Sequence, residues 1–489
     1  MLGSVVVLWL FILLLFFFIR VRRPKNFPPG PRPLPILGNL LQLDPANPLK
    51  DLERLKRRYG NVFSLYIGSR PAVVLNGLEV VREALVTRAA EYAGRPTHLM
   101  ISHLFKGKGV VMANYGSSWR DHRRFALTTL RNFGLGKRSM EERILEEVSH
   151  ICTELESSAG SSMDPQHLFH LAAKRFEYDD PVILTLIQRL EEFIKEAVGP
   201  WAMVQSKPCT TPCLLKRAPP LPFRNVFHKF DQIKEHIKKV VTKHKNSRVA
   251  GEPRDLLDCY LDQIDKTAEE GSTFNDTQMV SLLLDLFMAG TDTTSNTLRS
   301  AMLHLMTNQH CVFVPDRCHR EIAEVLEGRA DASFEDRHAM PYVQATIHEA
   351  QRMSDTVPLS VFHTTCSDTQ LHSYQLPQGT TVIPNLSSVL HEEGQWKFPH
   401  EFNPENFLNE VGEFVKPEAF LPFSAGSRVC LGEGLARMEL FLVLVTLLRR
   451  FRFVWPEDGG VPDFSLIFGG TQSPKPYRLG VRLRSSERG

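Results

Sequence analysis

The sequence from Asn275 to Asn308 predicts one long helix, which constrains the fold more than any other feature of the chain. At 1.5 Å per residue, such a helix is roughly 50 Å long and would cross a whole domain. Its centre, Leu282 to Gly290, is apolar on nearly every face apart from Asp285, so we expect the centre to be buried. The expected architecture is one large domain packed around this helix.

Most of the remaining body also has a helical pattern, and a small part has a strand pattern. Apolar residues recur at helical spacing in two segments, and another helix begins at Pro341, since proline suits the first helical position. Alternating residues around Gly68-Ser69 predict a β-hairpin. The predicted class is mainly α with a small β region, comprising helices at 141–155, 227–245, from 341 and 434–450, with strands at 62–67 and 72–75.

The N-terminus carries an unbroken apolar run from Val5 to Ile19, close to the ~20 residues that span a bilayer as a helix. A cleaved signal peptide would need a basic start, whereas here the positive charges follow the run. The positive-inside rule then places the downstream chain in the cytosol. We predict a transmembrane anchor at 1–20, a basic and proline-rich hinge at 21–36, stiff because proline fixes φ, and one large domain at 37–489.

Composition excludes some functions. The chain of 489 residues has a net charge of +3 and no run of like charges, so we expect no nucleic-acid partner. Its eight cysteines are scattered, which fits a reducing compartment better than a disulfide scaffold. The close pair Cys209 and Cys213 lacks a second pair, so we interpret it as loop.

The segment from Phe423 to Gly432 holds the strongest chemical signal. Cys430 lies in a glycine-flanked loop just before the predicted N-terminus of a helix. Backbone N–H groups and the helix dipole would stabilise a thiolate there, which could ligate a metal or act as a nucleophile. Gly426 and Gly432 would permit a tight backbone and the close approach of a flat ligand, and Arg428 would supply a cation. Alone, a buried inert cysteine is the alternative.

Polar residues in the middle of the long helix form a second signal. A threonine hydroxyl beside a carboxylate, Thr293 beside Asp292, can relay protons, and Gly290 would let a large group lie against the helix. A structural kink with satisfied polar groups is the alternative.

Two further pairs have helical spacing. Glu349 and Arg352 are three residues apart and would form an ion pair, which we interpret as structural. Trp119 and Arg123 are four apart, and an indole N–H beside a guanidinium suits a carboxylate. For each pair, an ordinary solvated helix face is the alternative.

Together these motifs resemble the cytochrome P-450 superfamily. The loop matches F-x-x-G-x-R-x-C-x-G at every fixed position, and A-G-x-D-T-T and E-x-x-R are matched as well. The anchor, the proline hinge and residues 420–440 look like microsomal family 2 members, which oxidise drugs and lipids. The resemblance covers residues 1 to about 484.

The resemblance implies a role for each motif around haem b, which would lie between the long helix and the loop. Cys430 would be the axial ligand of the haem iron. Asp292 and Thr293 would be the catalytic proton-relay pair, and Glu349 with Arg352 would stabilise the core. The third partner of that pair is usually charged in the family, whereas this chain has Asn406, which favours a looser network. The residues expected to hold the haem propionates are Trp119, Arg123, His363, Arg428 and the weaker candidate Arg95.

The implied reaction inserts one oxygen atom from O2 into a lipophilic substrate such as a xenobiotic or a fatty acid like arachidonate. The pocket would be lined by residues 95–113, Phe287, Ala289, residues 357–361 and Phe468. Electrons would come from NADPH through a membrane-bound flavoprotein reductase, with cytochrome b5 as a candidate second donor, at the endoplasmic reticulum membrane. A basic face with Arg120, Arg124 and Arg437 is the hypothesis for the docking site.

Three stretches depart from the family pattern: an apolar segment is missing after Ala173, residues 205–225 are atypical, and a few residues are inserted around Cys311 to Pro315. They leave a non-catalytic haem binder, or pseudoenzyme, as one alternative. The other is a haem-thiolate isomerase that needs no O2, which the retained Asp292 and Thr293 argue against.

Overall fold

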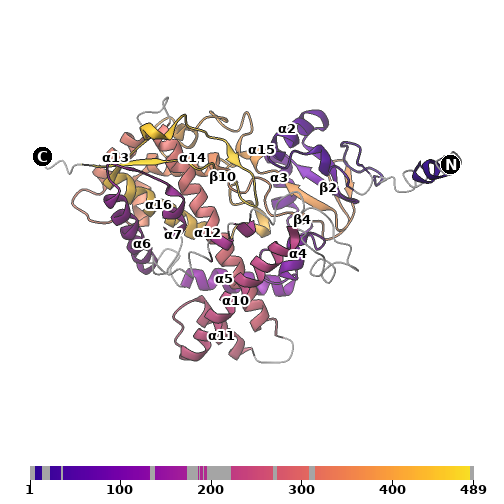
Figure 1. Cartoon of the computed structure of the whole chain (residues 1–489), viewed down its shortest axis with the longest axis horizontal. Coiled ribbons are helices and arrows are strands. Elements are labelled where there is room, and N and C mark those ends of the chain that lie inside the picture. The colour runs from indigo at the N-terminus through magenta and orange to yellow at the C-terminus, as the bar shows by residue number, and fades with distance from the viewer. Residues whose placement is uncertain are drawn as a thin grey trace.

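The computed structural model describes residues 6–13, 23–34, 37–132, 138–172, 186, 188–190, 192–194, 222–267, 272–307 and 314–484. Over these residues the chain is mainly helical with four small sheets, as the sequence predicts (Figure 1). The helices are α2 (Pro48–Tyr59), α3 (Leu78–Arg82), α4 (Met100–Phe105), α5 (Ser117–Asn132), α6 (Arg138–Ser157), α7 (Pro165–Ala172), α10 (Pro222–Ser247), α11 (Leu256–Lys266), α12 (Asp276–Thr307), α13 (Val314–Val325), α14 (Pro341–Ser354), α15 (Ser387–Leu390) and α16 (Glu433–Arg450).

The strands are short and belong to four separate sheets among the described residues. The largest has the order β1-β2-β7-β4, a second has the order β3-β11-β8, and β9-β10 and β5-β6 are two-stranded. Their bounds are β1 (Val62–Ile67), β2 (Arg70–Leu75), β3 (Ser162–Met163), β4 (His363–Thr364), β5 (Thr369–Leu371), β6 (Tyr374–Leu376), β7 (Thr381–Pro384), β8 (Phe451–Val454), β9 (Leu466–Ile467), β10 (Ser473–Pro474) and β11 (Leu479–Leu483).

The predicted hairpin is confirmed as β1 and β2, which pair antiparallel with Val62 opposite Leu75. Successive side chains of a strand point to opposite faces. Accordingly, Val73 and Leu75 enter one hydrophobic cluster, whereas Ala72 and Val74 enter another. Both faces of β2 are covered, which anchors this sheet in the interior beside α2 and α3 (Figure 1).

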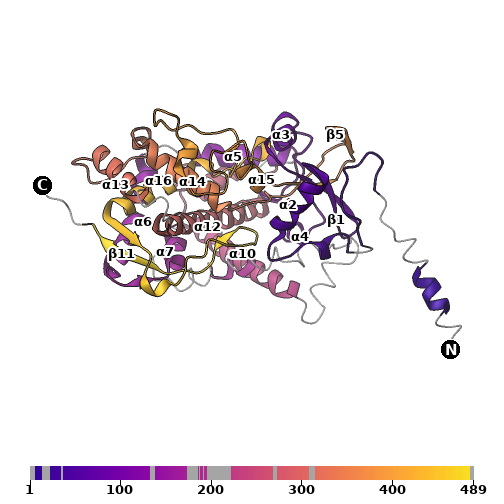
Figure 2. The ribbon, with the colours of Figure 1, turned by 90° about the horizontal axis from the view of Figure 1, so that it is seen from above.

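The predicted long helix is confirmed as α12, which has 32 residues and is about 48 Å long at 1.5 Å per residue. Asn275 precedes it, and its side chain accepts a hydrogen bond from the N–H of Gln278 at 3.1 Å, a capping contact. Figure 2 shows α12 running lengthwise through the middle of the molecule, between α14 and α16 on one side and α10 on the other.

The two halves of α12 join different hydrophobic clusters. The N-terminal half, including Leu282 and Leu284, packs with α5, α10 and α11. The C-terminal half, including Leu298 and Met302, packs with α6, α13, α14 and α16. The middle of α12 therefore lies at the boundary between two cores. The other predicted helices are also confirmed as α6, α10, α14 and α16, with α14 beginning at Pro341.

The predicted anchor is not confirmed as a bilayer-spanning helix. In the described part of the chain, no helix is both long and apolar enough to cross a membrane. A helical segment is described only over residues 6–13, whose apolar side chains are exposed. The departures predicted after Ala173 and at residues 205–221 and 311–313, together with Cys209 and Cys213, lie outside the described residues.

Candidate functional site

The middle of α12 and the loop that carries Cys430 both lie at the boundary between the two cores. Leu431 packs against the core of α5, α10 and α11, whereas Leu435 packs against the other core. On α12, Ala289 and Gly290 are exposed although the residues before and after this turn are largely buried. A Cβ added at Gly290 would meet no atom within 4 Å. Accessible surface therefore lies beside the centre of an otherwise buried helix.

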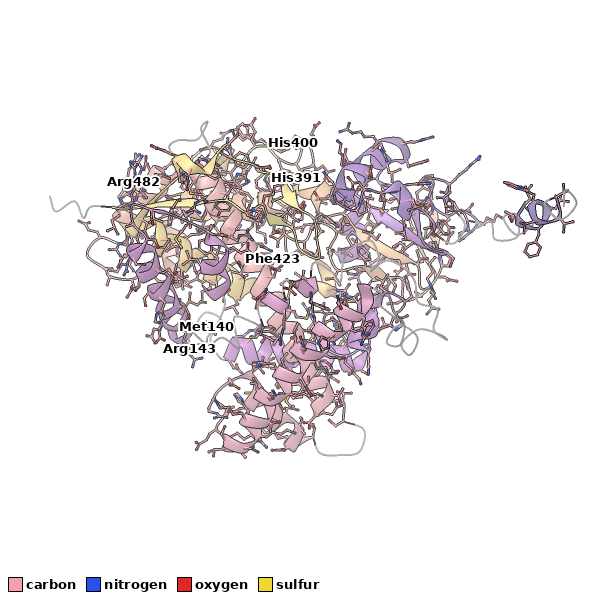
Figure 3. The ribbon with its side chains drawn as sticks, viewed as in Figure 1. Met140, Arg143, His391, His400, Phe423 and Arg482 are labelled. Carbon is pink, nitrogen blue, oxygen red and sulfur yellow. The ribbon has the colours of Figure 1, made fainter. Side chains whose placement is uncertain are left out.

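The Cys430 loop has the tight backbone that the sequence predicts. Gly426 adopts φ +71°, and an added Cβ would collide with the carbonyl of Leu85, so no other residue fits there without strain. The N–H of Cys430 donates to the carbonyl of Phe423 at 2.9 Å, which closes the loop. Figure 3 shows Phe423 near the middle of the molecule. At Gly432 an added Cβ would meet nothing within 4 Å, so this side of the loop permits close approach.

The pKa of the Cys430 thiol is shifted in opposite directions by its surroundings. Burial raises its pKa, while the N–H groups of Gly432 and Glu433, at the start of α16, and the Arg123 guanidinium lower it; the net direction is upward. The expected stabilisation by the helix N-terminus is present, but it does not outweigh burial. Cys430 nevertheless presents accessible surface. An interior sulfur of this kind suits a metal ion, since coordination deprotonates a thiol outright.

Three guanidinium groups gather beside the loop. Arg428 donates to the carbonyls of Ala93 at 2.9 Å and Ala113 at 2.8 Å, and Arg123 donates to Val429 O at 2.6 Å. Arg95 donates to the carbonyls of Val111, Val361 and Phe362 at 2.8 to 3.0 Å. None of the three forms an ion pair with another described residue.

The pKa values of these groups reflect their crowding. Burial lowers the pKa of Arg95 well below its usual range, and the charges of Arg428 and Arg123 lower it further. Burial and Arg123 likewise lower the pKa of Arg428 to about 10. Asp285 opposes this lowering for Arg95 only in part, and buried like charges are costly, so this cluster fits an anionic ligand.

His363 lies beside the cationic cluster as a neutral imidazole. Its Nδ1–H donates to Tyr92 O at 2.7 Å, and its buried Nε2 has no hydrogen-bond partner. Burial and the neighbouring Arg95 hold its pKa well below the usual range. Because Nδ1 already carries a proton, Nε2 would donate only in the imidazolium form, which an anion placed among the three arginines would stabilise. A ligand with two carboxylates and a metal near Cys430, such as haem, fits these residues.

Trp119 lies at the same cluster but does not aim its N–H at open space. Its indole N–H donates to the carbonyl of Val110 at 2.9 Å. The guanidinium carbons of Arg428 and Arg123 lie 4.2 Å and 5.6 Å from the centroid of its ring. In this structure Trp119 thus orients two arginines through cation–π contacts.

Asp292 and Thr293 are adjacent in sequence but face different neighbours. Thr293 donates its hydroxyl to Ala289 O at 2.8 Å, on the exposed side of α12. The buried carboxylate of Asp292 instead accepts a hydrogen bond from the hydroxyl of Thr471, in the loop between β9 and β10. Successive residues of an α-helix are about 100° apart, which explains the separation.

Glu349 and Arg352 form the predicted ion pair, with two N–O distances of 2.7 and 2.8 Å and no exposed surface on either side chain. The remaining N–H groups of Arg352 donate to carbonyls of residues 390, 398, 399 and 401. Asn406 donates to Glu349 at 3.2 Å, and the N–H of Asn403 donates to the same carboxylate at 2.8 Å. Asn406 therefore closes a fully bonded network, contrary to the looser one expected.

The sequence analysis assigns no role to Asp285, which interrupts the apolar centre of α12. Asp285 is buried in α12 and accepts the N–H groups of Val110 and Val111 at 2.6 and 3.0 Å. It therefore fixes the loop whose carbonyls bind Arg95, Arg428 and Trp119. A carboxylate inside an apolar helical run was the signal that could have identified it, since such a group needs buried donors.

Comparison with known proteins shows to which family the chain belongs. A family model described as Cytochrome P450 matches residues 28–481. The chain belongs to the cytochrome P450 family. It is 42% identical over 475 residues to cytochrome P450 2D3 of Rattus norvegicus, covering 94% of this chain and 93% of that protein. It is equally similar to vitamin D(3) 25-hydroxylase of Sus scrofa, at 42% over 476 residues, 94% of this chain and 93% of the relative.

The sequence-based family prediction is thus confirmed. Cytochrome P450 enzymes bind haem iron through a cysteine thiolate, and this protein is a haem-thiolate monooxygenase. Its relatives include cytochrome P450 2D14 of Bos taurus, 42% identical over 475 residues, 94% of this chain and 93% of the relative.

Proposed function

We propose that Cys430 supplies the axial thiolate of this cytochrome P450, and that Arg95, Arg123, Arg428 and His363 hold the two haem propionates. The observation that carries the proposal is the cationic cluster beside the Cys430 loop. The buried guanidiniums of Arg95 and Arg428 and the half-buried guanidinium of Arg123 form no ion pair among the described residues, and the buried Nε2 of His363 has no hydrogen-bond partner there. When bound, the haem supplies the oxygen-activating chemistry. Trp119 orients Arg123 and Arg428 rather than donating to a propionate.

The chain's own residues would supply position, water exclusion and protons. Phe287 and Val361 both pack against the core of α5, α10 and α11, and Ala289 is exposed beside them, so the wall next to Gly290 is apolar. Phe468 packs against a separate hydrophobic cluster that includes Leu359 and the strand residues Phe63 and Val74. Such walls favour a lipophilic substrate by burying its apolar surface. Thr293 would deliver protons on this side of α12, and Asp292, whose carboxylate is turned toward Thr471, would supply them.

A fatty acid such as arachidonate, a sterol-like lipid or a lipophilic xenobiotic is the substrate class we propose. A relative bears the name vitamin D(3) 25-hydroxylase, which agrees with hydroxylation of a lipid.

We also propose that the enzyme is held at the endoplasmic reticulum membrane by an anchor at residues 1–20, with the catalytic domain in the cytosol. The support is the apolar run from Val5 to Ile19 followed by basic residues, and the exposed apolar side chains of residues 6–13.

A membrane-bound NADPH-dependent flavoprotein reductase, with cytochrome b5 as a second donor, would supply electrons at the exposed Arg120 and Arg124 of α5. Arg437 was part of the predicted docking face, but its guanidinium is held by Glu433 at 2.8 Å and by His348 at 2.5 Å. We therefore restrict the proposed docking site to α5.

Charge reversal of Arg120 and Arg124 together should slow reduction of the haem iron, and an unchanged rate would contradict this site.

The proposed function is tested by turnover of the full-length protein in membranes with the reductase, NADPH and O2, using arachidonate and 7-ethoxycoumarin as substrates. We expect oxygenated product that requires all three components. Product formed without NADPH would contradict it and favour an O2-independent isomerase. No product from correctly folded, haem-loaded protein would contradict the proposed substrate class.

A further inference from the structure

The hydroxyl of Thr471 donates a hydrogen bond to Oδ2 of Asp292, across 179 positions of sequence. Asp292 is buried at 6% exposure, and Thr471 is half-buried. We propose that Thr471 is a positioning residue for the carboxylate of Asp292, and that through it the loop between β9 and β10 controls proton delivery in the reaction. This inference rests on the proposed function, in which Asp292 belongs to the proton path.

Thr471 can position a carboxylate because its own loop is fixed to the protein. The N–H of the next residue, Gln472, donates to Thr356 O at 2.8 Å, and its buried side-chain amide donates to Asp355 O at 2.8 Å. The hydroxyl of Thr356 in turn lies 3.2 Å from that of Thr297, one and a half turns beyond Asp292 on α12. The loop is thus attached to α12 by one route that includes Asp292 and by a second route that avoids it.

A third attachment lies farther along the same helix. Arg299 donates to Pro474 O in β10 at 3.3 Å, and Tyr477 donates to Arg299 O at 2.7 Å. These contacts hold the loop in register with α12, so loss of the Thr471 hydroxyl should release the Asp292 side chain without detaching the loop. The effect of a substitution at Thr471 can therefore be local.

The orientation of Asp292 matters because it faces away from the exposed surface at Gly290. Thr293 presents its hydroxyl toward Ala289 on that surface, but the Asp292 carboxylate is turned toward the C-terminal loop. A proton entering at half-exposed Thr471 can reach Asp292 through their shared hydrogen bond. Asp292 can pass it onward only by rotating about its side-chain bonds, and Thr471 determines how readily it does so.

The same loop adjoins a candidate substrate contact. Phe468 lies three residues before Thr471 and packs against the hydrophobic cluster that includes Leu359. A substrate that displaces Phe468 would move the loop and, with it, the donor to Asp292. Proton delivery would then depend on whether the pocket is filled.

Product coupling provides the readout. Hydroxylation follows RH + O2 + NADPH + H⁺ → ROH + H2O + NADP⁺, whereas the unproductive reaction follows O2 + NADPH + H⁺ → H2O2 + NADP⁺. Both use the same electron pair, so the ratio of product to peroxide per NADPH reports on proton delivery rather than on electron supply.

The experiment compares wild type, Thr471→Val, Thr471→Ser, Asp292→Asn and the Thr471→Val/Asp292→Asn double variant, in membranes with the reductase and the better of the two substrates named above. Ser473→Ala is the matched control, since Ser473 lies in the same hairpin and its side chain makes no hydrogen bond to α12 in the described region. The carbon monoxide spectrum of each variant verifies the haem site.

We expect Thr471→Val to keep the thiolate-type spectrum and to lower product per NADPH several-fold, with a matching rise in peroxide. Thr471→Ser should restore the wild-type ratio, and Thr471→Val should add no further loss in the Asp292→Asn background. A wild-type ratio in Thr471→Val, or an equal loss with and without Asp292, would overturn the assignment. Absence of turnover in wild type itself would instead overturn the proposed function.

Discussion

Arg437 donates from Nη1 to Nε2 of His348 at 2.5 Å, which joins α14 to α16, the helix that follows the Cys430 loop. His348 can accept because it stays neutral: burial lowers its pKa to about 3, and its Nδ1–H donates to Gln344 O at 2.7 Å. The guanidinium carbon of Arg437 also lies 5.4 Å from the ring centroid of Phe423, whose carbonyl closes the loop. The contact between Arg437 and His348 therefore helps to fix Phe423, and through it the Cys430 loop.

Substitution His348→Phe should destabilise the protein by about 1–3 kcal/mol, because it keeps a ring but leaves Nη1 of the half-buried Arg437 without its acceptor. Urea denaturation measures the free energy of unfolding. The exposed His338→Phe should change it by less than about 0.5 kcal/mol. The cost should also shrink in an Arg437→Met background, and an equal cost in both backgrounds would show that the hydrogen bond is unimportant.

Substitution Arg352→Met should prevent accumulation of folded, haem-loaded protein. It leaves the fully buried Glu349 carboxylate uncompensated, and breaking a buried ion pair in this way costs about 3–5 kcal/mol. Haem content per protein and circular dichroism check the outcome. The matched control, Arg57→Met, removes an exposed pair with Glu53 and should cost about 1 kcal/mol or less. Normal yield of Arg352→Met would refute the structural role of the pair.

Asp285 should make stability depend on pH. Burial raises the pKa of its carboxyl to about 7, whereas in an unfolded chain an aspartate ionises near pH 4. Between these values the folded state holds a proton that the unfolded state has lost, so stability falls as pH rises through this window, by about 1.4 kcal/mol per unit.

Asp285→Asn removes this ionisation and keeps an oxygen that can accept the N–H groups of Val110 and Val111. We expect the stability of the variant, relative to wild type, to increase from pH 5 to pH 7, as measured by urea denaturation at both values. The exposed Asp331→Asn serves as the control. Parallel pH profiles of wild type and Asp285→Asn would contradict the buried, protonated carboxyl.

Arg428→Gln should weaken haem binding on the order of tenfold or more, because it removes a buried cation that we assign to a propionate. Competition for haem with a second, haem-free haem-binding protein measures the affinity. The far-ultraviolet circular dichroism of the variant verifies its fold. Arg120→Gln, on an exposed position of α5, should leave the affinity unchanged. If both variants retain haem equally, the cationic cluster has another purpose.

The regular elements were predictable from the sequence because their signals are local. The start of α14 at Pro341 follows from the preference of proline for the first helical position, and the start of α12 follows Asn275, whose side chain caps it. The ion pair of Glu349 and Arg352 follows from their spacing on one helix. The sequence likewise predicts a tight backbone at Gly426, and its φ of +71° confirms this.

The orientations of particular side chains were not predictable because they depend on distant partners. The helical spacing places Trp119 and Arg123 on one face, but it cannot show that the indole N–H donates to Val110 O. Adjacent positions suggested that Asp292 and Thr293 act as a pair, whereas the carboxylate is bound by Thr471, far along the chain. The sequence suggests Arg437 as a docking cation because it cannot show that the partner of Arg437, His348, lies on another helix.

The central claim is that Cys430 is the axial ligand of the haem iron, and a carbon monoxide difference spectrum tests it most directly. Wild type and Cys430→Ser would be expressed in membranes, reduced, and compared at equal protein content, with the buried Cys318→Ser as a matched control. We predict the red-shifted Soret band of thiolate-ligated haem for wild type and Cys318→Ser, and its loss in Cys430→Ser. The same band in Cys430→Ser, or its absence from folded, haem-loaded wild type, would contradict the assignment.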